Sequence, residues 1–432
     1  MRAMICSNVM LRVAQKNSCR WLSSSSAAAI EDLPLQFLRA SDPANFDKDT
    51  FQRKDVVFDK SSGKPLITST LKTPFMREYS LHGESYKVVW DDGVVSEYQR
   101  SWVKKQLDLW GKSDIQRVMW NDLTEDRVRT SKDLSMGFEE VLTSNGQAKA
   151  LKALYQYGIL LVTNTPIDDR CSGSVATVAS ALGGGAKKDD TSVLNNYLKG
   201  QNYDRLEGVV DGPLRTLYGT VWSTSTSDQS AGASTADSAY GNESLPLHTD
   251  MTYIRDPPGL QIFTMVRPAT TGGESLFGDG FAAAEKLRSV DPTSFRVLSE
   301  LPRRYRCVDR VSGWHLEASG PVIALNYGRV VGIRHNDLDR LPDLPPEGVE
   351  DVDEFYKTVN RAHQAWDKIL ASDDIRLILR LQAGETAIVA NQRCFHGRLG
   401  FSLDGYSSRV IKGCYVSQDE FESRLRWEGY HV

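Results

Sequence analysis

The sequence predicts a mainly β fold with flanking helices, in which short strands form a closed barrel or two packed sheets. The first indication is a series of short apolar runs separated by turns in the second half of the chain. The clearest of these expected strands are residues 261–266, 322–326, 330–333, 386–390 and 409–416. The second indication is that just two longer helical patterns, 280–290 and 352–370, intervene. We find no internal repeat.

The composition indicates one large domain with a smaller attachment. The chain has 432 residues, of which 40% are hydrophobic, and a formal net charge of −4, so it can bury a sizeable core. This near-neutral net charge does not indicate the basic surface that binds nucleic acid. No apolar run approaches the roughly 20 residues that a membrane helix needs. We therefore expect neither a nucleic-acid nor a membrane partner, and the sequence leaves a homodimer open.

The first 30 residues differ from the rest of the chain. Four basic residues precede a serine run at 23–26, and no acidic residue occurs before Glu31. A segment rich in arginine and serine and poor in acids is typical of an organelle transit peptide. We predict that residues 1–30 direct the protein to the mitochondrial matrix. A plastid is an alternative destination, and a disordered tail is the alternative without targeting.

Residues 31–130 are expected to form a small β-rich module. The run 86–90 has the character of a strand, an Asp-Asp-Gly turn of the hairpin kind follows it, and 94–98 resumes a strand. A short helix is expected at 101–109, before a polar linker over 110–135.

The remaining residues, 135–432, are expected to form the large domain. It begins with a helix at 138–157, a buried strand at 158–162 and a helix at 175–182. Residues 223–238 are rich in Ser, Thr, Ala and Gly and have no apolar face, so we expect a loop there. Because the loop precedes a histidine motif, it is either an active-site lid or an ordinary disordered insertion.

His248, Asp250 and the distant His396 form a candidate metal site. In a strand, residues i and i+2 point to the same face, so His248 and Asp250 would project together. Two histidines and one carboxylate are the ligand set that holds Fe(II) on one face and leaves the other positions open. The short motif recurs by chance, but the chain has only 7 histidines in all. The joint pattern therefore favours iron, with a zinc or manganese hydrolase as an alternative use of the same side chains.

Arg409 lies 13 residues after His396, on the next expected strand. A guanidinium group binds a carboxylate through two parallel hydrogen bonds. An arginine that faces a barrel interior is costly unless it is paired. We predict that Arg409 binds the carboxylate of an anionic co-substrate, with the Ser275 hydroxyl as a second contact. A surface arginine on an edge strand is the alternative.

Five sequence motifs carry a family resemblance. They are Leu-His-Thr-Asp-Met-Thr-Tyr at 247–253, Pro-Pro-Gly at 257–259, Thr-Gly-Gly-Glu-Ser at 271–275, Gly-Asp-Gly-Phe at 278–281 and Asn-Gln-Arg-Cys-Phe-His-Gly-Arg at 391–398. In order and spacing they resemble the carnitine-biosynthesis branch of the Fe(II)/2-oxoglutarate oxygenases. The resemblance implies a double-stranded β-helix, or jelly roll, with the small module appended. It also implies Fe(II), 2-oxoglutarate, molecular oxygen, and ascorbate to keep the iron reduced.

Members of this branch hydroxylate trimethyllysine or γ-butyrobetaine, and both substrates carry a trimethylammonium group. Aromatic faces attract such a cation, which cannot donate hydrogen bonds. By resemblance, the residues that would enclose it are Tyr218, Trp222, Tyr240 and Tyr415, although core packing is the alternative for each. Asn336 lies in a segment similar to the family's substrate-binding strand, so the resemblance implies a contact with the amino-acid head group.

Within the branch, the sequence resembles the trimethyllysine enzymes more than the γ-butyrobetaine enzymes. In the latter an aromatic residue commonly follows the aspartate directly, whereas Met251 stands there in this chain. We predict hydroxylation of N6,N6,N6-trimethyllysine at carbon 3, with γ-butyrobetaine hydroxylation as the nearest alternative. A non-catalytic binder of methylated amines is another alternative, but it would need neither the iron ligands nor Arg409.

The small N-terminal module departs from the family pattern in its zinc ligands. Many relatives hold zinc there through a cysteine cluster and a histidine. In this chain residues 37–46 contain no cysteine, and Val94 follows the Asp-Asp-Gly turn. Because zinc needs thiolate or imidazole ligands, we predict that this module binds no zinc.

Overall fold

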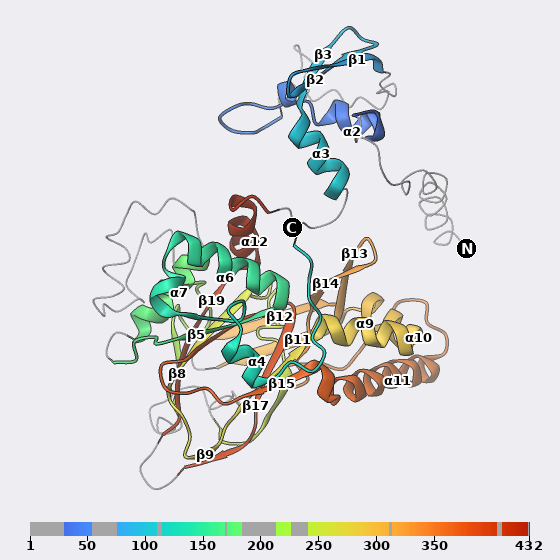
Figure 1. Cartoon of the computed structure of the whole chain (residues 1–432). Coiled ribbons are helices and arrows are strands. Elements are labelled where there is room, and N and C mark those ends of the chain that lie inside the picture. The colour runs from blue at the N-terminus through green and yellow to red at the C-terminus, as the bar shows by residue number, and fades with distance from the viewer. Residues whose placement is uncertain are drawn as a thin grey trace. The chain divides into compact units, whose positions relative to one another are not determined.

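The computed structural model describes residues 30–53, 76–109, 115–168, 171–183, 213–225, 241–310, 313–403, 408–430 and 432. The chain divides into two units, Met1–Lys112 and Ser113–Val432 (Figure 1). The sequence prediction placed this boundary near residue 130. All but the last residue of the expected leader, and most of the expected loop at 223–238, lie outside the described residues.

The first unit is built on a three-stranded antiparallel sheet with the order β1-β2-β3. Its elements are η1 (Ile30–Asp32), α2 (Leu35–Ala40), η2 (Pro43–Asn45), β1 (Met76–His82), β2 (Ser85–Trp90), β3 (Val95–Gln99) and α3 (Arg100–Leu109). The strands predicted at 86–90 and 94–98 and the helix predicted at 101–109 are confirmed to within one residue.

Side-chain alternation explains how this sheet builds a core. Val88 and Trp90 on β2 and Tyr98 on β3 are buried against Ile30 and Leu38. Strand β1 is almost wholly exposed, and it has no such alternation, which is why the sequence did not predict it. The absence of zinc from this unit stays a prediction.

Two sheets form the centre of the second unit (Figure 1). The large sheet has the order β4-β5-β16-β8-β19-β6, and the small sheet has the order β15-β10-β17-β7. All neighbours are antiparallel except β4 with β5. The strands are β4 (Ser135–Gly137), β5 (Ile159–Thr163), β6 (Trp222–Ser225), β7 (Leu245–His248), β8 (Leu260–Arg267), β10 (Ser275–Asp279), β15 (Arg376–Leu379), β16 (Thr386–Ala390), β17 (Cys394–Arg398) and β19 (Val410–Val416).

The path of the chain through these sheets is that of a jelly roll. From β6 to β10 and again from β15 to β19, successive strands alternate between the large and the small sheet, apart from the short β9 (Thr271–Gly272) and β18 (Phe401–Ser402), which pair with each other. Phe263, Met265 and Ile411 of the large sheet pack against Phe277 and Leu377 of the small sheet. The predicted double-stranded β-helix is therefore confirmed.

Helices cover both sheets from outside. Against the large sheet pack α5 (Phe138–Val141), α6 (Ser144–Tyr157), α7 (Cys171–Leu182) and α12 (Gln418–Trp427). A second group, α9 (Gly280–Val290), α10 (Pro292–Glu300) and α11 (Val352–Leu370), shares a core with the small sheet and the hairpin of β13 (Ile323–Asn326) and β14 (Arg329–Ile333). No helix within the described ranges combines the length and apolar character needed to cross a membrane.

Two local predictions were wrong, and one hairpin was missed. The single helix expected at 138–157 is two helices, because Thr143 accepts a hydrogen bond from the Gly146 N–H and so begins α6 anew. The expected linker contains a short helix, α4 (Glu125–Thr130), with Thr124 as its N-cap. The hairpin of β11 (Arg303–Asp309) and β12 (Trp314–Gly320) was not predicted.

Candidate active site

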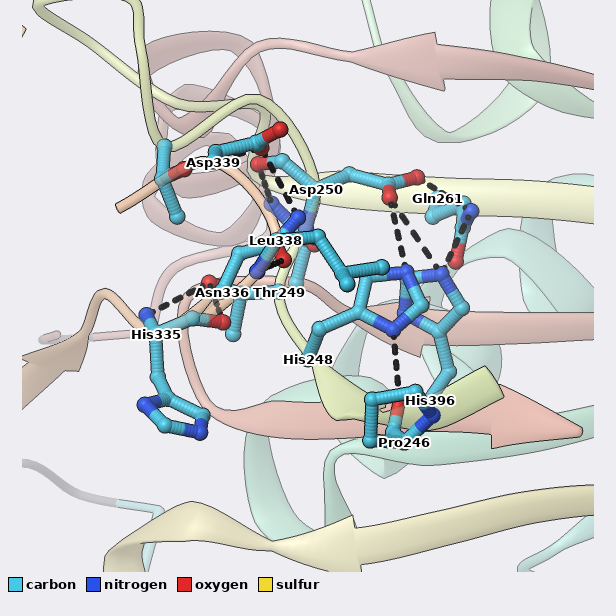
Figure 2. Close-up of polar contacts among 12 residues, drawn as sticks. Pro246, His248, Thr249, Asp250, Gln261, His335, Asn336, Leu338, Asp339 and His396 are labelled. Atoms are coloured by element: carbon cyan, nitrogen blue, oxygen red, sulfur yellow. Dashed lines mark hydrogen bonds and ion pairs between the residues drawn. The ribbon is translucent and has the colours of Figure 1, made fainter. Parts of the chain in front are cut away.

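Strands β7 and β17 bring the two histidines of the predicted metal site together. His248 is the last residue of β7 and is paired with His396 of β17, with 4.3 Å between the ring centroids. Oδ1 of Asp250 lies 3.4 Å from Nε2 of each histidine. Figure 2 shows the three side chains pointing toward one another. In the described part of the chain they are the one group of three or more His, Cys, Asp or Glu side chains that could hold a metal ion.

Asp250 reaches this site from a turn, whereas the sequence prediction placed it on a strand. Strand β7 ends at His248, and Met251 turns the chain with a φ of 56°. The Asn391 side chain holds the turn, because its Oδ1 accepts from the Asp250 N–H at 2.8 Å and its Nδ2 donates to the Asp250 carbonyl at 3.2 Å. His248 and Asp250 do point into the same site. The turn held by Asn391, and not the alternation of a strand, brings them there.

The hydrogen bonds of both histidines direct a nitrogen lone pair into the site. Nδ1 of His248 lies 2.8 Å from the Pro246 carbonyl, so Nδ1 carries the proton and donates it. Nε2 of His396 lies 3.2 Å from the Gln261 amide nitrogen, from which it accepts. In the neutral ring Nε2 of His248 therefore carries no proton and can bind a metal, whereas a metal at Nε2 of His396 would take the place of the hydrogen bond from Gln261. Two such imidazoles with one carboxylate fit a divalent first-row metal such as Fe(II).

The electrostatics of the site favour an ionised carboxylate. Burial opposes ionisation of Asp250, but the adjacent His396 and His248 outweigh burial and lower its pKa. Burial also lowers the pKa of His396. For His248, burial acts in the same direction, but the hydrogen bond and charge of Asp250 outweigh it and raise the pKa. A bound cation would take the place of these protons.

Two residues that the sequence prediction did not assign to the metal site contact Asp250 directly. Gln261 of β8 donates its amide N–H to Oδ2 of Asp250 at 2.5 Å (Figure 2). The Tyr415 hydroxyl donates to the same oxygen at 2.7 Å. Tyr415 was predicted as part of the aromatic enclosure, whereas Gln261 lies in an apolar strand and gave no local signal.

Arg409 lies at the opposite end of β19 from Tyr415. It immediately precedes β19 and is buried, with its Nη2 atom 3.5 Å from the Gly273 carbonyl and its guanidinium 5.5 Å from the Phe401 ring centroid. Burial, together with the charge of Arg398, lowers the pKa of Arg409 to about 10. An anion bound here would offset both effects.

The predicted second contact to the co-substrate, Ser275, is buried on β10. It is paired with Arg398 of β17 and lies two residues after Gly273, the residue whose carbonyl Arg409 approaches. Ser275 and Arg409 therefore belong to the same end of the two sheets.

An aromatic cluster adjoins the metal site. Met251, Tyr253, Tyr305 and Tyr415 are buried together, and Tyr218 and Trp222 pack against them. The Trp222 and Tyr415 rings have centroids 6.1 Å apart, and the hydroxyls of Tyr218 and Tyr253 are 3.3 Å apart.

Three of the four residues predicted to enclose the cation thus share one cluster. The fourth, Tyr240, lies outside the described residues. The sequence analysis did not predict Tyr253 and Tyr305 as members of this cluster. The position of Tyr253, three residues after Asp250, offered a signal, whereas Tyr305 lies on the unpredicted hairpin.

Asn336 follows β14 and uses its side chain within its own turn. Its Nδ2 donates to Asp339 at 2.8 Å, and its Oδ1 accepts from the Leu338 N–H at 3.0 Å (Figure 2). Thr252, two residues after Asp250, donates its hydroxyl to the same Asp339 at 3.2 Å. The segment around Asn336 is therefore tied to the turn that carries Asp250.

Comparison with known proteins gives one family and several curated relatives. The family model described as "Taurine catabolism dioxygenase TauD, TfdA family" matches residues 122–415. The mitochondrial trimethyllysine dioxygenase of Rattus norvegicus is 29% identical over 79% of this chain and 72% of its own length. Dioxygenase str8 of Strobilurus tenacellus is 26% identical over 93% and 89% of the two chains. The γ-butyrobetaine dioxygenase of Pongo abelii is 24% identical over 89% and 90%.

Proposed function

We propose a function for this chain from one premise: it belongs to the TauD, TfdA family of dioxygenases. The chain is therefore a dioxygenase, with Fe(II) as its cofactor and 2-oxoglutarate as its co-substrate. Its substrates are a small molecule and molecular oxygen. We propose below which residues carry the reaction and which small molecule is the substrate.

His248, Asp250 and His396 would hold the iron, through Nε2 of each histidine and Oδ1 of Asp250. Their convergence, the orientation of their lone pairs and the ionised carboxylate support this assignment. Such a set leaves three positions open on one side of the metal. When bound, Fe(II) and 2-oxoglutarate supply the oxidant that converts a C–H group to C–OH, while 2-oxoglutarate and oxygen yield succinate and carbon dioxide.

Arg409 would bind the carboxylate of 2-oxoglutarate that lies away from the metal. A buried guanidinium whose pKa is lowered to about 10 gains from an anionic partner. Ser275 would add a hydroxyl donor at the same end of the sheets. Arg409 and Tyr415 lie at opposite ends of β19, so they would contact different ligands, 2-oxoglutarate and the substrate respectively.

The small molecule would be a trimethylammonium compound. The observation that carries this proposal is the position of Tyr415, whose ring lies in the aromatic cluster and whose hydroxyl bonds a proposed iron ligand. A cation held on the faces of Tyr218, Trp222 and Tyr415 would lie beside the metal. Tyr240 would complete the enclosure. Holding the cation there would determine which carbon faces the metal.

Trimethyllysine is the substrate that we favour, with hydroxylation at carbon 3 as the first step of carnitine biosynthesis. The printed name of the Rattus norvegicus relative supports it, as does Met251 directly after Asp250. Asn336 would contact the amino-acid head group, and ascorbate would keep the iron reduced. The γ-butyrobetaine alternative has its own support, since a relative of that name covers more of this chain.

Oxygen consumption and succinate formation test this function. The protein is incubated with Fe(II), 2-oxoglutarate, ascorbate and one of three amines: trimethyllysine, γ-butyrobetaine or unmethylated lysine. We expect trimethyllysine alone to couple oxygen uptake to succinate and a 3-hydroxylated product. Coupling with γ-butyrobetaine alone would make the substrate assignment wrong. Turnover of lysine at the same rate would mean that the aromatic enclosure does not select a trimethylammonium substrate.

The same assay separates the other classes of function. A non-catalytic binder would bind trimethyllysine without consuming oxygen, and His248→Ala would leave that binding unchanged. A zinc or manganese hydrolase would turn over its substrate in an anaerobic vessel. Either result would contradict the dioxygenase mechanism derived from these residues.

The domain and targeting assignments also remain proposals. Residues 1–30 would direct import into the mitochondrial matrix, which the word "mitochondrial" in the name of the rat relative supports. The zinc-free module, predicted to span residues 31–130, would end at Lys112, and the oxygenase domain, predicted to span 135–432, would begin at Ser113. Fusing residues 1–30 to a fluorescent protein tests the first assignment, and a cytosolic signal would contradict it. Metal analysis of the purified chain before any chelation tests the absence of zinc, and zinc that persists when His248 is replaced by alanine would contradict it.

A further inference from the structure

The two carboxylate oxygens of Asp250 have different surroundings. Oδ1 lies 3.4 Å from Nε2 of both His248 and His396. Oδ2 accepts one hydrogen bond from Gln261 at 2.5 Å and another from Tyr415 at 2.7 Å. Figure 2 shows Gln261 beside this carboxylate. One oxygen therefore faces the histidines, while donors hold the other.

The two donors come from paired positions in the large sheet. Gln261 of β8 and Tyr415 of β19 are opposite each other in the antiparallel register, and residues in that relation place their side chains on the same face. Both side chains are buried, with 3% and 5% exposure. The large sheet thus presents two donors to Asp250, which follows a strand of the small sheet.

We infer that Gln261 and Tyr415 are positioning residues that hold Asp250 as a one-oxygen ligand of the metal. This inference rests on the proposed function, which places iron between Asp250 and the two histidines. A carboxylate can bind a metal through one oxygen or two. Binding through Oδ1 alone keeps both hydrogen bonds on Oδ2, and it leaves open the positions that 2-oxoglutarate and oxygen need.

Packing alone does not explain the amide of Gln261. Among the described residues, its Oε1 atom is buried and has no hydrogen-bond partner. Burying an amide oxygen without a partner opposes folding. An apolar side chain of the same length would avoid that cost, so the amide is best explained by its donor end, which bonds Oδ2 of Asp250.

Tyr415 also connects this pair of donors to the aromatic cluster. Its ring centroid lies 6.1 Å from that of Trp222, and its hydroxyl bonds Asp250. A cation on these rings would restrict Tyr415 to the position from which it donates. Metal and substrate would then strengthen each other's binding, by the same factor in both directions.

Metal titration without substrate tests the positioning role. Gln261→Met and Tyr415→Phe remove one donor each and keep most of the side-chain volume. Anaerobic titration with Co(II), whose visible absorption reports the coordination geometry, should show affinities about 10- to 100-fold lower than that of the wild type. The visible spectrum should also change. Thermal unfolding of the metal-free proteins confirms that each variant folds.

Tyr305→Phe is the matched control. It removes a tyrosine hydroxyl from the same aromatic cluster, but that hydroxyl donates to the Arg334 carbonyl at 2.9 Å. We expect wild-type Co(II) affinity and spectrum. If Gln261→Met and Tyr415→Phe behave like this control, the inference is wrong. A wild type that binds Co(II) but does not oxidise trimethyllysine would instead contradict the proposed function alone.

A second titration tests the connection to substrate. Trimethyllysine should tighten Co(II) binding by the wild type, and this gain should disappear in Tyr415→Phe, which keeps the ring and loses the hydroxyl. An equal gain in both proteins would contradict the connection through Tyr415.

Discussion

His248 and His396 are opposite each other on β7 and β17, so a single strand pairing joins two ligands that lie far apart in the chain. Their rings are already 4.3 Å apart, and the turn that carries Asp250 is held by the Asn391 side chain. Backbone pairing and hydrogen bonds from side chains therefore position the proposed metal ligands. The register of the small sheet places the two histidines, and the turn and loop that carry Asp250 and Asn391 place the third ligand.

Replacing one of these ligands should abolish metal binding without unfolding the protein. In His396→Ala, the backbone pairing of β17 with β7 remains, so the metal-free protein should unfold within about 4 °C of the wild type. Fe(II) binding and 2-oxoglutarate decarboxylation should fall to background. His315→Ala, at an exposed position of β12, is the control and should keep full activity. Decarboxylation by His396→Ala at the wild-type rate would exclude this ligand set.

Substitution of Arg409 by lysine should weaken 2-oxoglutarate binding selectively. Arg409→Lys keeps the charge but cannot form two parallel hydrogen bonds to a carboxylate. Loss of this buried two-hydrogen-bond contact with a carboxylate should increase the KM for 2-oxoglutarate by about 30-fold or more. Steady-state kinetics with varied 2-oxoglutarate measures the change, and Co(II) affinity should not alter.

A neighbouring arginine provides the matched control for this experiment. Arg267 is exposed at the end of β8 and donates to Ser408 at 2.9 Å. Arg267→Lys should leave KM for 2-oxoglutarate unchanged. Equal effects of the two substitutions would indicate a general disturbance of this end of the sheet.

The elements that the sequence predicted well are those with a strong apolar pattern. Strands β8, β16 and β19 are buried almost throughout and appear in the sequence as apolar runs between turns. The hairpin β11–β12 mixes buried residues with exposed ion-pair partners such as Arg304 and Glu317. Strand β11 has four charged residues out of seven and no apolar run, whereas β12 does alternate apolar and polar residues over 314–319, a signal that the prediction missed.

Residues of the site were predictable where they form a local motif. His248 and Asp250 are neighbours in sequence, and Arg409 has a characteristic separation from a histidine. Gln261 has no such signal, and Asn391, although it begins the 391–398 motif, gave no sign of its contact with the Asp250 backbone, because both roles depend on long-range placement. Gln261 reaches Asp250 only through the register of β8 against β19, and Asn391 through the position of the loop before β17.

The aromatic enclosure should recognise positive charge and not merely shape. Trp222→Leu removes one aromatic face, and a cation–π contact of about 0.5–2 kcal/mol corresponds to a roughly 2- to 30-fold increase in KM for trimethyllysine. The uncharged analogue, in which carbon replaces the quaternary nitrogen, tests the cause. Its inhibition constant should change less than KM does. A parallel change in both would indicate that Trp222 contributes packing alone.

The buried ion pair between Arg393 and Asp279 should be important for stability. Arg393 donates to both carboxylate oxygens, at 3.2 and 2.8 Å, and Asp279 also caps the start of α9. Asp279→Asn leaves a buried guanidinium without its counter-charge and should lower the free energy of unfolding by about 3–5 kcal/mol. Glu317→Gln breaks an exposed, solvent-screened pair and should leave the free energy of unfolding nearly unchanged. Urea denaturation distinguishes the two, and equal losses would contradict this account.

His335 should make the protein less stable in mild acid. Burial lowers the pKa of His335 to about 4 from the ordinary 6.5, and its ring lies edge-on to those of Trp366 and Phe395. Above pH 6.5 the imidazole is neutral in both the folded and the unfolded chain. As pH falls from 6.5 toward 4, only the unfolded chain takes up the proton, so stability falls by an amount on the order of 3 kcal/mol.

A comparison with His335→Leu isolates this contribution from those of other groups. The leucine variant cannot be protonated, so its free energy of unfolding should fall less steeply between pH 6.5 and pH 4. Urea denaturation at several pH values measures the free energy of unfolding of both proteins. The value for the variant minus that for the wild type should increase as pH falls. Parallel curves would mean that His335 is protonated equally in the folded and unfolded chains, which its burial between two aromatic rings should prevent.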